Sequence, residues 1–124
     1  MDIFFEFHDS RCLQLNEDGT VLIDAYVHHK AEGVGGYQLL QISIHSAAIK
    51  GNLGELPSDI YDGILSLGGE VIQNNTFPFN SPLPAKLDLT LADDARTIEM
   101  TGTGVTVDSA GPFRFVEGLP RNMS

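Results

Sequence analysis

The chain has 124 residues, of which 42% are hydrophobic and 19% charged, as expected for one globular domain with its own core. Its 17 acidic and 7 basic residues give a formal net charge of −10, which disfavours binding to nucleic acids and to anionic membrane surfaces. This composition argues against a disordered or fibrous chain, and no apolar run is long enough to cross a bilayer.

Apolar and polar residues alternate with a period of two along most of the chain, and no segment has the periodicity of an amphipathic helix. Such a pattern is typical of half-buried β-strands. At the N-terminus we expect a first strand, a turn near Asp9 and Ser10, and a second strand at 11–15. In this arrangement Phe5 pairs with Leu13, so that the apolar faces of both strands coincide.

The next predicted unit is a hairpin of strands 20–29 and 37–49. It follows a tight turn in which Gly19 is the residue best able to adopt a positive φ. Opposing Val27 with Leu40 places the apolar residues of both strands on one face. The glycine-rich segment KAEGVGG between the strands is then expected to be a mobile loop.

In the middle of the chain the sequence predicts at most one short helical turn, at 57–62, closed by Gly63. The segment ILSLGGEVIQ is either a strand pair or one strand interrupted at Gly68 and Gly69. The segment NNTFPFNSPLP has three prolines, which cannot donate to a β-ladder. It should therefore run along a sheet edge or cross between sheets.

The last third has the clearest alternation, with Leu87, Leu89 and Leu91 on one face. A turn at ADDAR leads to a return strand that contains Ile98. Beyond it the apolar positions change parity, which predicts a bulge at 102–104. A short strand at GPFRFVEG completes a single domain over 1–124. About eight to ten short strands indicate an all-β fold, either an antiparallel β-sandwich or a partly closed barrel.

Three of the four histidines lie in or beside the predicted central hairpin. In the expected register His28 and His45 are about 20 Å apart along the strands, too far for one metal ion. His28 and His29 are neighbours in a strand and so point to opposite faces. We therefore predict no metal site and no cofactor. A non-local transition-metal site that includes His8 is the alternative.

Cys12 is the only cysteine, so an intrachain disulfide is impossible, and we interpret this thiol as structural. The N-terminus has no signal-peptide pattern. Together these features predict a cytoplasmic protein. The chain has no nucleophile elbow and no P-loop, and nothing singles out a pair of catalytic carboxylates, so its catalytic residues, if any, are unknown and we lean towards a protein that is not an enzyme.

The net charge makes a basic protein the best candidate partner. Phe77 and Phe79 are interpreted first as core residues, with an exposed contact patch as the alternative. The candidate partner surface therefore consists of Asp59, Asp62, Asp93, Asp94, Phe77 and Phe79.

The leading functional hypothesis is a non-catalytic protein that binds another protein through an acidic surface, as an adaptor or an immunity-type inhibitor does. One alternative is a small-ligand-binding β-barrel. The other is a metal-dependent or hydrolytic enzyme whose site is assembled from non-sequential residues. An edge strand would also offer a route to homo-oligomers.

Overall fold

The computed structural model describes residues 3–29, 31–51, 56–73, 75–91 and 96–118. Within these ranges every regular element is a β-strand. The strands are β1 (Ile3–Leu15), β2 (Thr20–His29), β3 (Val34–Ile44), β4 (Ala48–Gly51), β5 (Ser58–Leu67), β6 (Glu70–Val71), β7 (Asn75–Thr76), β8 (Phe79–Ser81), β9 (Ala85–Leu91), β10 (Arg96–Gly102), β11 (Val105–Ser109) and β12 (Arg114–Gly118).

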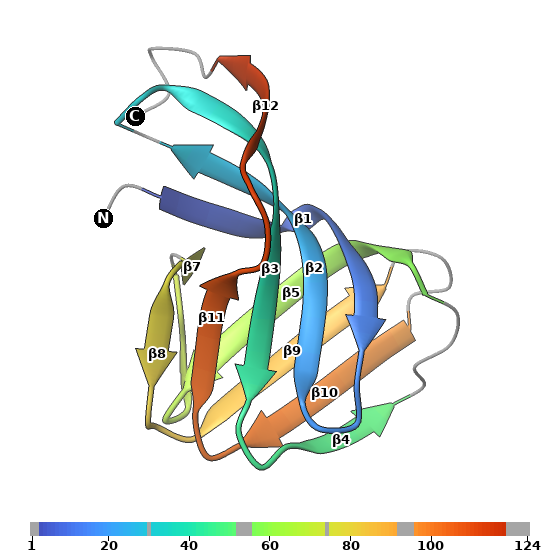
Figure 1. The fold of residues 1–124 in the computed structure, drawn as a ribbon. Helices are drawn as coiled ribbons and strands as arrows, with labels where there is room; N and C mark the ends of the chain where they lie inside the picture. The colour runs from blue at the N-terminus through green and yellow to red at the C-terminus, as the bar shows by residue number, and fades with distance from the viewer. Residues whose placement is uncertain (1–2, 30, 52–55, 74, 92–95, 119–124) are drawn as a thin grey trace.

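The strands form one strongly curled antiparallel sheet with the order β4-β10-β9-β5-β1-β2-β3-β11-β8 (Figure 1). Three further strands attach to it, β12 to β3, β6 to β5 and β7 to β1. The prediction of an all-β fold, either an antiparallel sandwich or a partly closed barrel, is confirmed. The strands outnumber the expected eight to ten because β6, β7 and β8 contain only two or three residues each.

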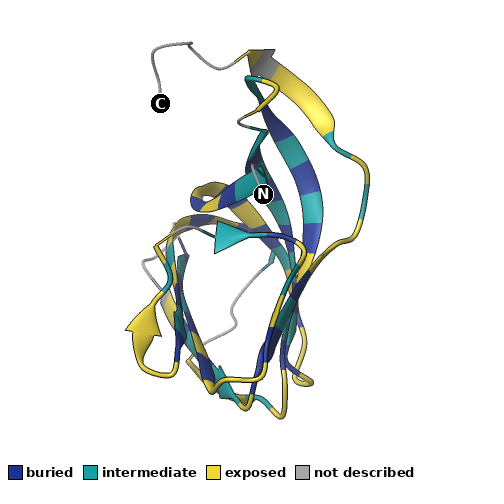
Figure 2. Ribbon diagram, turned by 90° about the vertical axis from the view of Figure 1, so that its left-hand side faces the viewer, coloured by how far each residue is buried: buried dark blue, intermediate teal, exposed yellow. Residues whose placement is uncertain are grey.

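The core lies inside the curled sheet and is built from the alternating apolar faces (Figure 2). The inward positions expected from the sequence are fully buried: Val21, Ile23, Ala25, Val27, Leu40, Ile42, Ile44, Leu87, Leu89, Leu91, Ile98 and Met100. Burial of this many branched apolar side chains supplies the main stabilisation of the fold.

The turn predicted near Asp9 and Ser10 is wrong, because β1 is one continuous strand that bends there. Its register against β2 shifts between Glu6 and Arg11, and Asp9 adopts a positive φ of 71°. The hydroxyl of the buried Ser10 donates to the carbonyl of Glu6 and accepts the N–H of Tyr26 at 3.0 Å. The Ser10 side chain therefore stabilises a bend within one strand, at the place where a turn between two strands was expected.

The register expected for β2 and β3 is also wrong. Val27 pairs with Gly36, four positions from Leu40, so β3 begins at Val34 and part of the predicted loop is strand. A Cβ atom on Gly36 would lie 2.1 Å from the carbonyl oxygen of Arg114. The glycines at this end of β3 therefore permit the close passage of β12.

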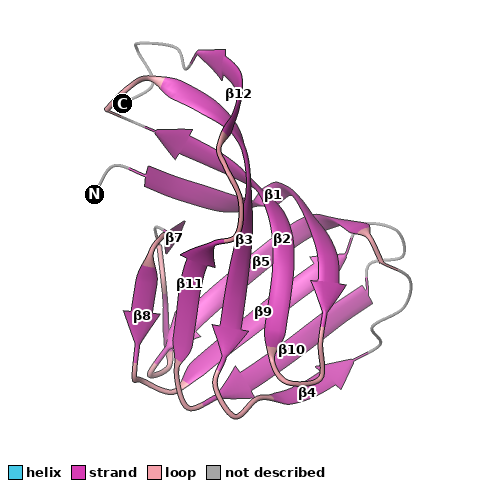
Figure 3. Cartoon of the chain, viewed as in Figure 1, coloured by secondary structure: helices cyan, strands magenta, loops and turns pink. Residues whose placement is uncertain are grey.

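No helical turn occurs at the described residues of 57–62, because β5 starts at Ser58 (Figure 3). Ser58 and Asp59 pair with Cys12 and Arg11 of β1. This long-range pairing makes the segment a strand, although its proline and glycine locally favour a turn.

Two expectations concern the connections after β5. Gly68 and Gly69 form the turn of the β5–β6 hairpin, so the strand-pair interpretation is confirmed. The bulge predicted at 102–104 is wrong. Those residues form a corner between β10, which pairs with β9, and β11, which pairs with β3. The change of partner strand explains the change in the parity of the apolar positions.

The proline-rich segment lies at the end of the sheet order, as predicted, where β8 pairs with β11. The expected final strand is present as β12. Of the turn predicted at ADDAR, 92–95 lie outside the described residues, and Arg96 begins β10. In the described ranges no helix has the length and apolar character needed to span a bilayer.

Candidate interaction surface

Two irregularities in neighbouring strands meet on the outside of the barrel. One is the bend of β1, and the other is a bulge in β5, where Ile60 and Asp62 pair with consecutive residues of β9 and Tyr61 is the extra residue. The ring Nδ1 of His8, in the β1 bend, donates to the carbonyl oxygen of Tyr61 at 3.0 Å. This bond joins the two irregularities.

The apolar side of the same junction depends on a glycine. Phe7 turns into the core from the β1 bend and is buried. A Cβ atom on Gly63 would lie 2.4 Å from Cγ of Phe7, so only glycine leaves room for the ring. Packing of Phe7 against β5 therefore fixes the bend whose other residues project into solvent.

Negative charge gathers around His8. Its pKa is raised above 6.5, first by the hydrogen bond to the Tyr61 carbonyl and then by the charge of Asp9, with smaller contributions from Glu6 and Asp62. The Asp62 carboxylate also accepts the N–H of Gly63 at 2.8 Å, which orients it in the bulge. An exposed imidazole is thus surrounded by carboxylates from two strands.

Large apolar side chains are exposed beside these charges. Tyr61 keeps 65% of its surface accessible, and Ile64 and Val71 are exposed as well. Val71 pairs with Ser66, two residues beyond Ile64 in β5. We call the resulting strip the β5 surface, consisting of Asp59, Tyr61, Asp62, Ile64 and Val71.

Most cations in the described part of the chain are already engaged. Their ion pairs are Arg11 with Asp59 at 3.2 Å, Lys86 with Glu99 at 3.0 Å and Asp88 at 3.7 Å, and Arg114 with Asp24. Of the lysines and arginines whose side chains the structure describes, Arg11, Lys50, Lys86 and Arg114, none lies in ion-pair distance of Asp9, Asp62 or Glu70. The negative potential near the β5 surface is therefore only partly compensated.

The structure places the residues proposed from sequence in different environments. Asp59 and Asp62 both lie on strand β5 and not in the helical turn predicted at 57–62. Asp93 and Asp94 fall outside the described residues. Phe77 is buried in the core, and Phe79 is half-buried against it. The two phenylalanines therefore follow the core interpretation, not that of an exposed patch.

The histidines have separate local partners. His28 lies 3.3 Å from Glu6, and His29 lies 3.8 Å from Glu32. His45 contacts the Thr106 hydroxyl at 2.9 Å. Because His28 pairs with Gly35, it lies about 34 Å from His45 along β3, further than expected. The described residues include no group of three His, Cys, Asp or Glu side chains suited to a metal ion.

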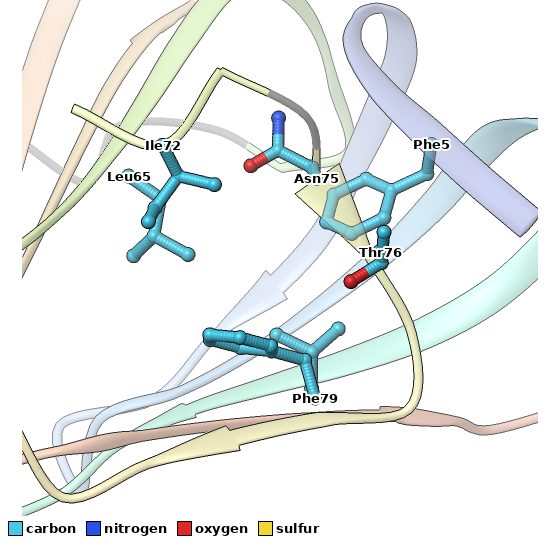
Figure 4. Close-up of a pocket in the computed structure, with 7 residues that line it drawn as sticks. Phe5, Leu65, Ile72, Asn75, Thr76 and Phe79 are labelled. Carbon is cyan, nitrogen blue, oxygen red and sulfur yellow. The ribbon is translucent and has the colours of Figure 1, made fainter. Parts of the chain in front are cut away.

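A small cavity lies under β7 and β8, lined by Phe5, Leu65, Ile72, Asn75, Thr76, Phe79 and Val107 (Figure 4). Its volume is about 10 Å³, which is room for about one water molecule. The side-chain oxygen of Asn75 is buried without a hydrogen-bond partner, and a single water would satisfy it.

Sequence reasoning missed His8, Tyr61, Ile64 and Val71 as members of or neighbours to this surface. The exposure of Tyr61 results from a bulge, and the approach of His8 results from a pairing of strands far apart in sequence. Neither has a local signature. Comparison of the chain with protein-family models, with curated proteins and with solved structures gave no match.

Proposed function

We propose that this chain is a non-catalytic binding protein that recognises a basic protein through the β5 surface. The observation that carries the proposal is the position of Tyr61, which is 65% exposed and lies beside incompletely neutralised carboxylates. Tyrosine is enriched among the residues that dominate binding energy at protein interfaces. Carboxylates around it would attract a basic surface and orient it.

This assignment corresponds to an adaptor or an immunity-type inhibitor that covers a basic surface, and we place it in the reducing cytoplasm. The small cavity under β7 and β8 does not itself provide a site for a ligand-binding barrel. A space for about one water molecule is far below the several hundred Å³ of ordinary ligand sites.

The test is affinity capture from the native cell with three immobilised forms of the chain: the natural chain, Tyr61→Ser and Leu83→Ser. Leu83 is the matched control because it is 51% exposed on the connection between β8 and β9. Basic proteins retained by the natural chain and by Leu83→Ser, but lost with Tyr61→Ser, would support the proposal. A captured set that is the same for all three forms would overturn it.

The kinetics of any captured partner give a second criterion. Association should slow as salt rises, because the Debye length falls from about 30 Å at 0.01 M to about 8 Å at 0.15 M. Asp62→Lys should lower the association rate, whereas Glu17→Lys, in the β1–β2 turn, should lower it less. Reversal of Asp93 and Asp94 to lysine tests the other acidic segment proposed from sequence. An association rate indifferent to salt and to Asp62→Lys would contradict an electrostatic role.

A further inference from the structure

His8 lies against the centre of the β5 surface. Its ring Nδ1 donates to the backbone carbonyl of Tyr61 at 3.0 Å, and the Tyr61 side chain is the largest exposed group of that surface. The His8 side chain is itself 67% exposed, because Phe7 turns into the core and its neighbour in the strand projects to the opposite side. A positive charge on the His8 ring is therefore presented at the place where a partner would dock.

The hydrogen bond to Tyr61 does not depend on whether His8 is charged. A carbonyl oxygen can only accept, so Nδ1 carries a hydrogen in the neutral ring as well as in the protonated one. Protonation therefore adds its hydrogen at Nε2, which lies 3.6 Å from the Asp9 carboxylate. The two states of the ring should differ in charge while the ring keeps its place beside Tyr61.

The surroundings of His8 are mainly acidic. The titratable and charged groups of the adjoining strand segments are Glu6, Asp9 and Arg11 of β1, Asp59, Tyr61 and Asp62 of β5, and Tyr26 and His28 of β2. Arg11 is held in its ion pair with Asp59 at 3.2 Å. The charge of His8 is therefore the variable part of the potential that a basic partner meets at this surface.

We propose that His8 regulates the β5 surface through its charge, so that a basic partner binds more tightly when the imidazole is neutral than when it is protonated. This inference rests on the proposed function of the β5 surface. One added positive charge about 6 Å from a cationic group of the partner should weaken binding about threefold at low salt. Because the pKa of His8 is raised above 6.5, the change of affinity falls near neutral pH.

A lysine homopeptide of about eight residues is the probe, because all of its side chains are cationic. Its binding is followed at about pH 5.5 and about pH 8.5, on either side of the His8 titration, through the NMR signals of the Tyr61 ring and the Ile64 methyl groups. Salt is kept at about 0.02 M, where charges are little screened. The ratio of the dissociation constants at the lower and the higher pH should be about threefold larger for the natural chain than for His8→Gln.

Two substitutions separate the charge of His8 from its hydrogen bond. Glutamine offers a donor but no charge, whereas lysine is charged at both pH values. At the higher pH His8→Gln should bind the peptide as the natural chain does, and His8→Lys should bind it about threefold more weakly. The matched control is His45→Gln, since His45 contacts Thr106 at 2.9 Å and not the β5 surface. This control should keep the pH dependence of the natural chain.

Titration of the His8 ring protons with and without saturating peptide gives a second measurement that needs no substitution. Because coupling is reciprocal, the pKa of His8 should be lower in the complex, by about 0.5 for a threefold effect. An unchanged pKa, or equal affinities of folded His8→Lys and His8→Gln, would overturn the inference and leave the binding surface itself in place. If the peptide shifts the signals of neither Tyr61 nor Ile64, the inference fails together with the proposed function.

Discussion

The imidazole Nδ1 of His8 donates a hydrogen bond to the backbone carbonyl of Tyr61, 53 residues further along the chain and 3.0 Å away. This bond and the carboxylates of Asp9, Glu6 and Asp62 all favour the protonated ring. We expect the pKa of His8, measured by NMR titration of its ring protons, to lie above 6.5. In Asp9→Asn it should fall towards the ordinary value.

The direction of the associated stability change follows from the same shift. Because the pKa of His8 is raised in the folded state, protonated His8 stabilises the fold fully below about pH 6.5, and this contribution is lost as pH rises through the raised pKa. The effect should be small, since the ring is exposed. A His8 pKa at or below 6.5 would contradict the observed contact.

The replacement Gly63→Ala should destabilise the fold by about 1–3 kcal/mol, the usual cost of forcing extra atoms into a packed core. The added Cβ atom would lie 2.4 Å from the ring of Phe7, so the β1 bend would have to move. Urea unfolding gives the measurement. Gly118→Ala, which meets no atom closer than 3.9 Å, is the control and should change the free energy of unfolding by less than about 0.5 kcal/mol. Equal stability of the two variants would disprove the packing of Phe7 on β5.

The faces of the strands could be predicted from the sequence, whereas their registers could not. Leu87, Leu89 and Leu91 are buried as expected, because period-two alternation is a local property. The β2–β3 register was wrong by four residues, an even number that leaves every side chain on its expected face. Apolar patterning alone therefore could not distinguish the two registers. The close approach of β12 to Gly36, which requires a glycine there, is visible only in the structure.

The candidate site was predictable only in part, for a related reason. The high negative charge directed attention to Asp59 and Asp62, which lie on β5. The bulge that exposes Tyr61 and the bend that brings His8 to it depend on pairing between β1 and β5. Pairing between strands so far apart in sequence depends on packing of the whole core. The sequence around Tyr61 alone therefore cannot predict the bulge or the approach of His8.

Removal of the buried Ser10 hydroxyl should destabilise the fold, although the group is small. It makes two hydrogen bonds within the β1 bend, one to the carbonyl of Glu6 and one from the N–H of Tyr26. Loss of a buried hydrogen-bonding group costs about 1–3 kcal/mol, so Ser10→Ala should lower the free energy of unfolding by this amount in urea. Ser66→Ala, at a half-buried position on β5, is the comparison. A Ser10→Ala variant no less stable than Ser66→Ala would show that the bend does not depend on this hydroxyl.

The thiol of Cys12 should be unreactive in the native protein. It is fully buried, and burial raises its pKa to about 11, so almost none of it is thiolate at pH 8. Ellman's reagent should react slowly with the folded chain and rapidly in denaturing urea. Rapid reaction without denaturant would mean that β1 opens readily at this position.

Strand β1 pairs with β2, β5 and β7, and these partners are distributed over the chain as far as Thr76. During synthesis β1 must therefore wait until Thr76 has been made before its last neighbour is available. Only its hairpin with β2 can form early, since loop closure over longer separations is slower. The sheet around β1 is therefore completed only after a long stretch of chain has been made, and a chaperone that shields nascent apolar segments would act on β1 during this interval.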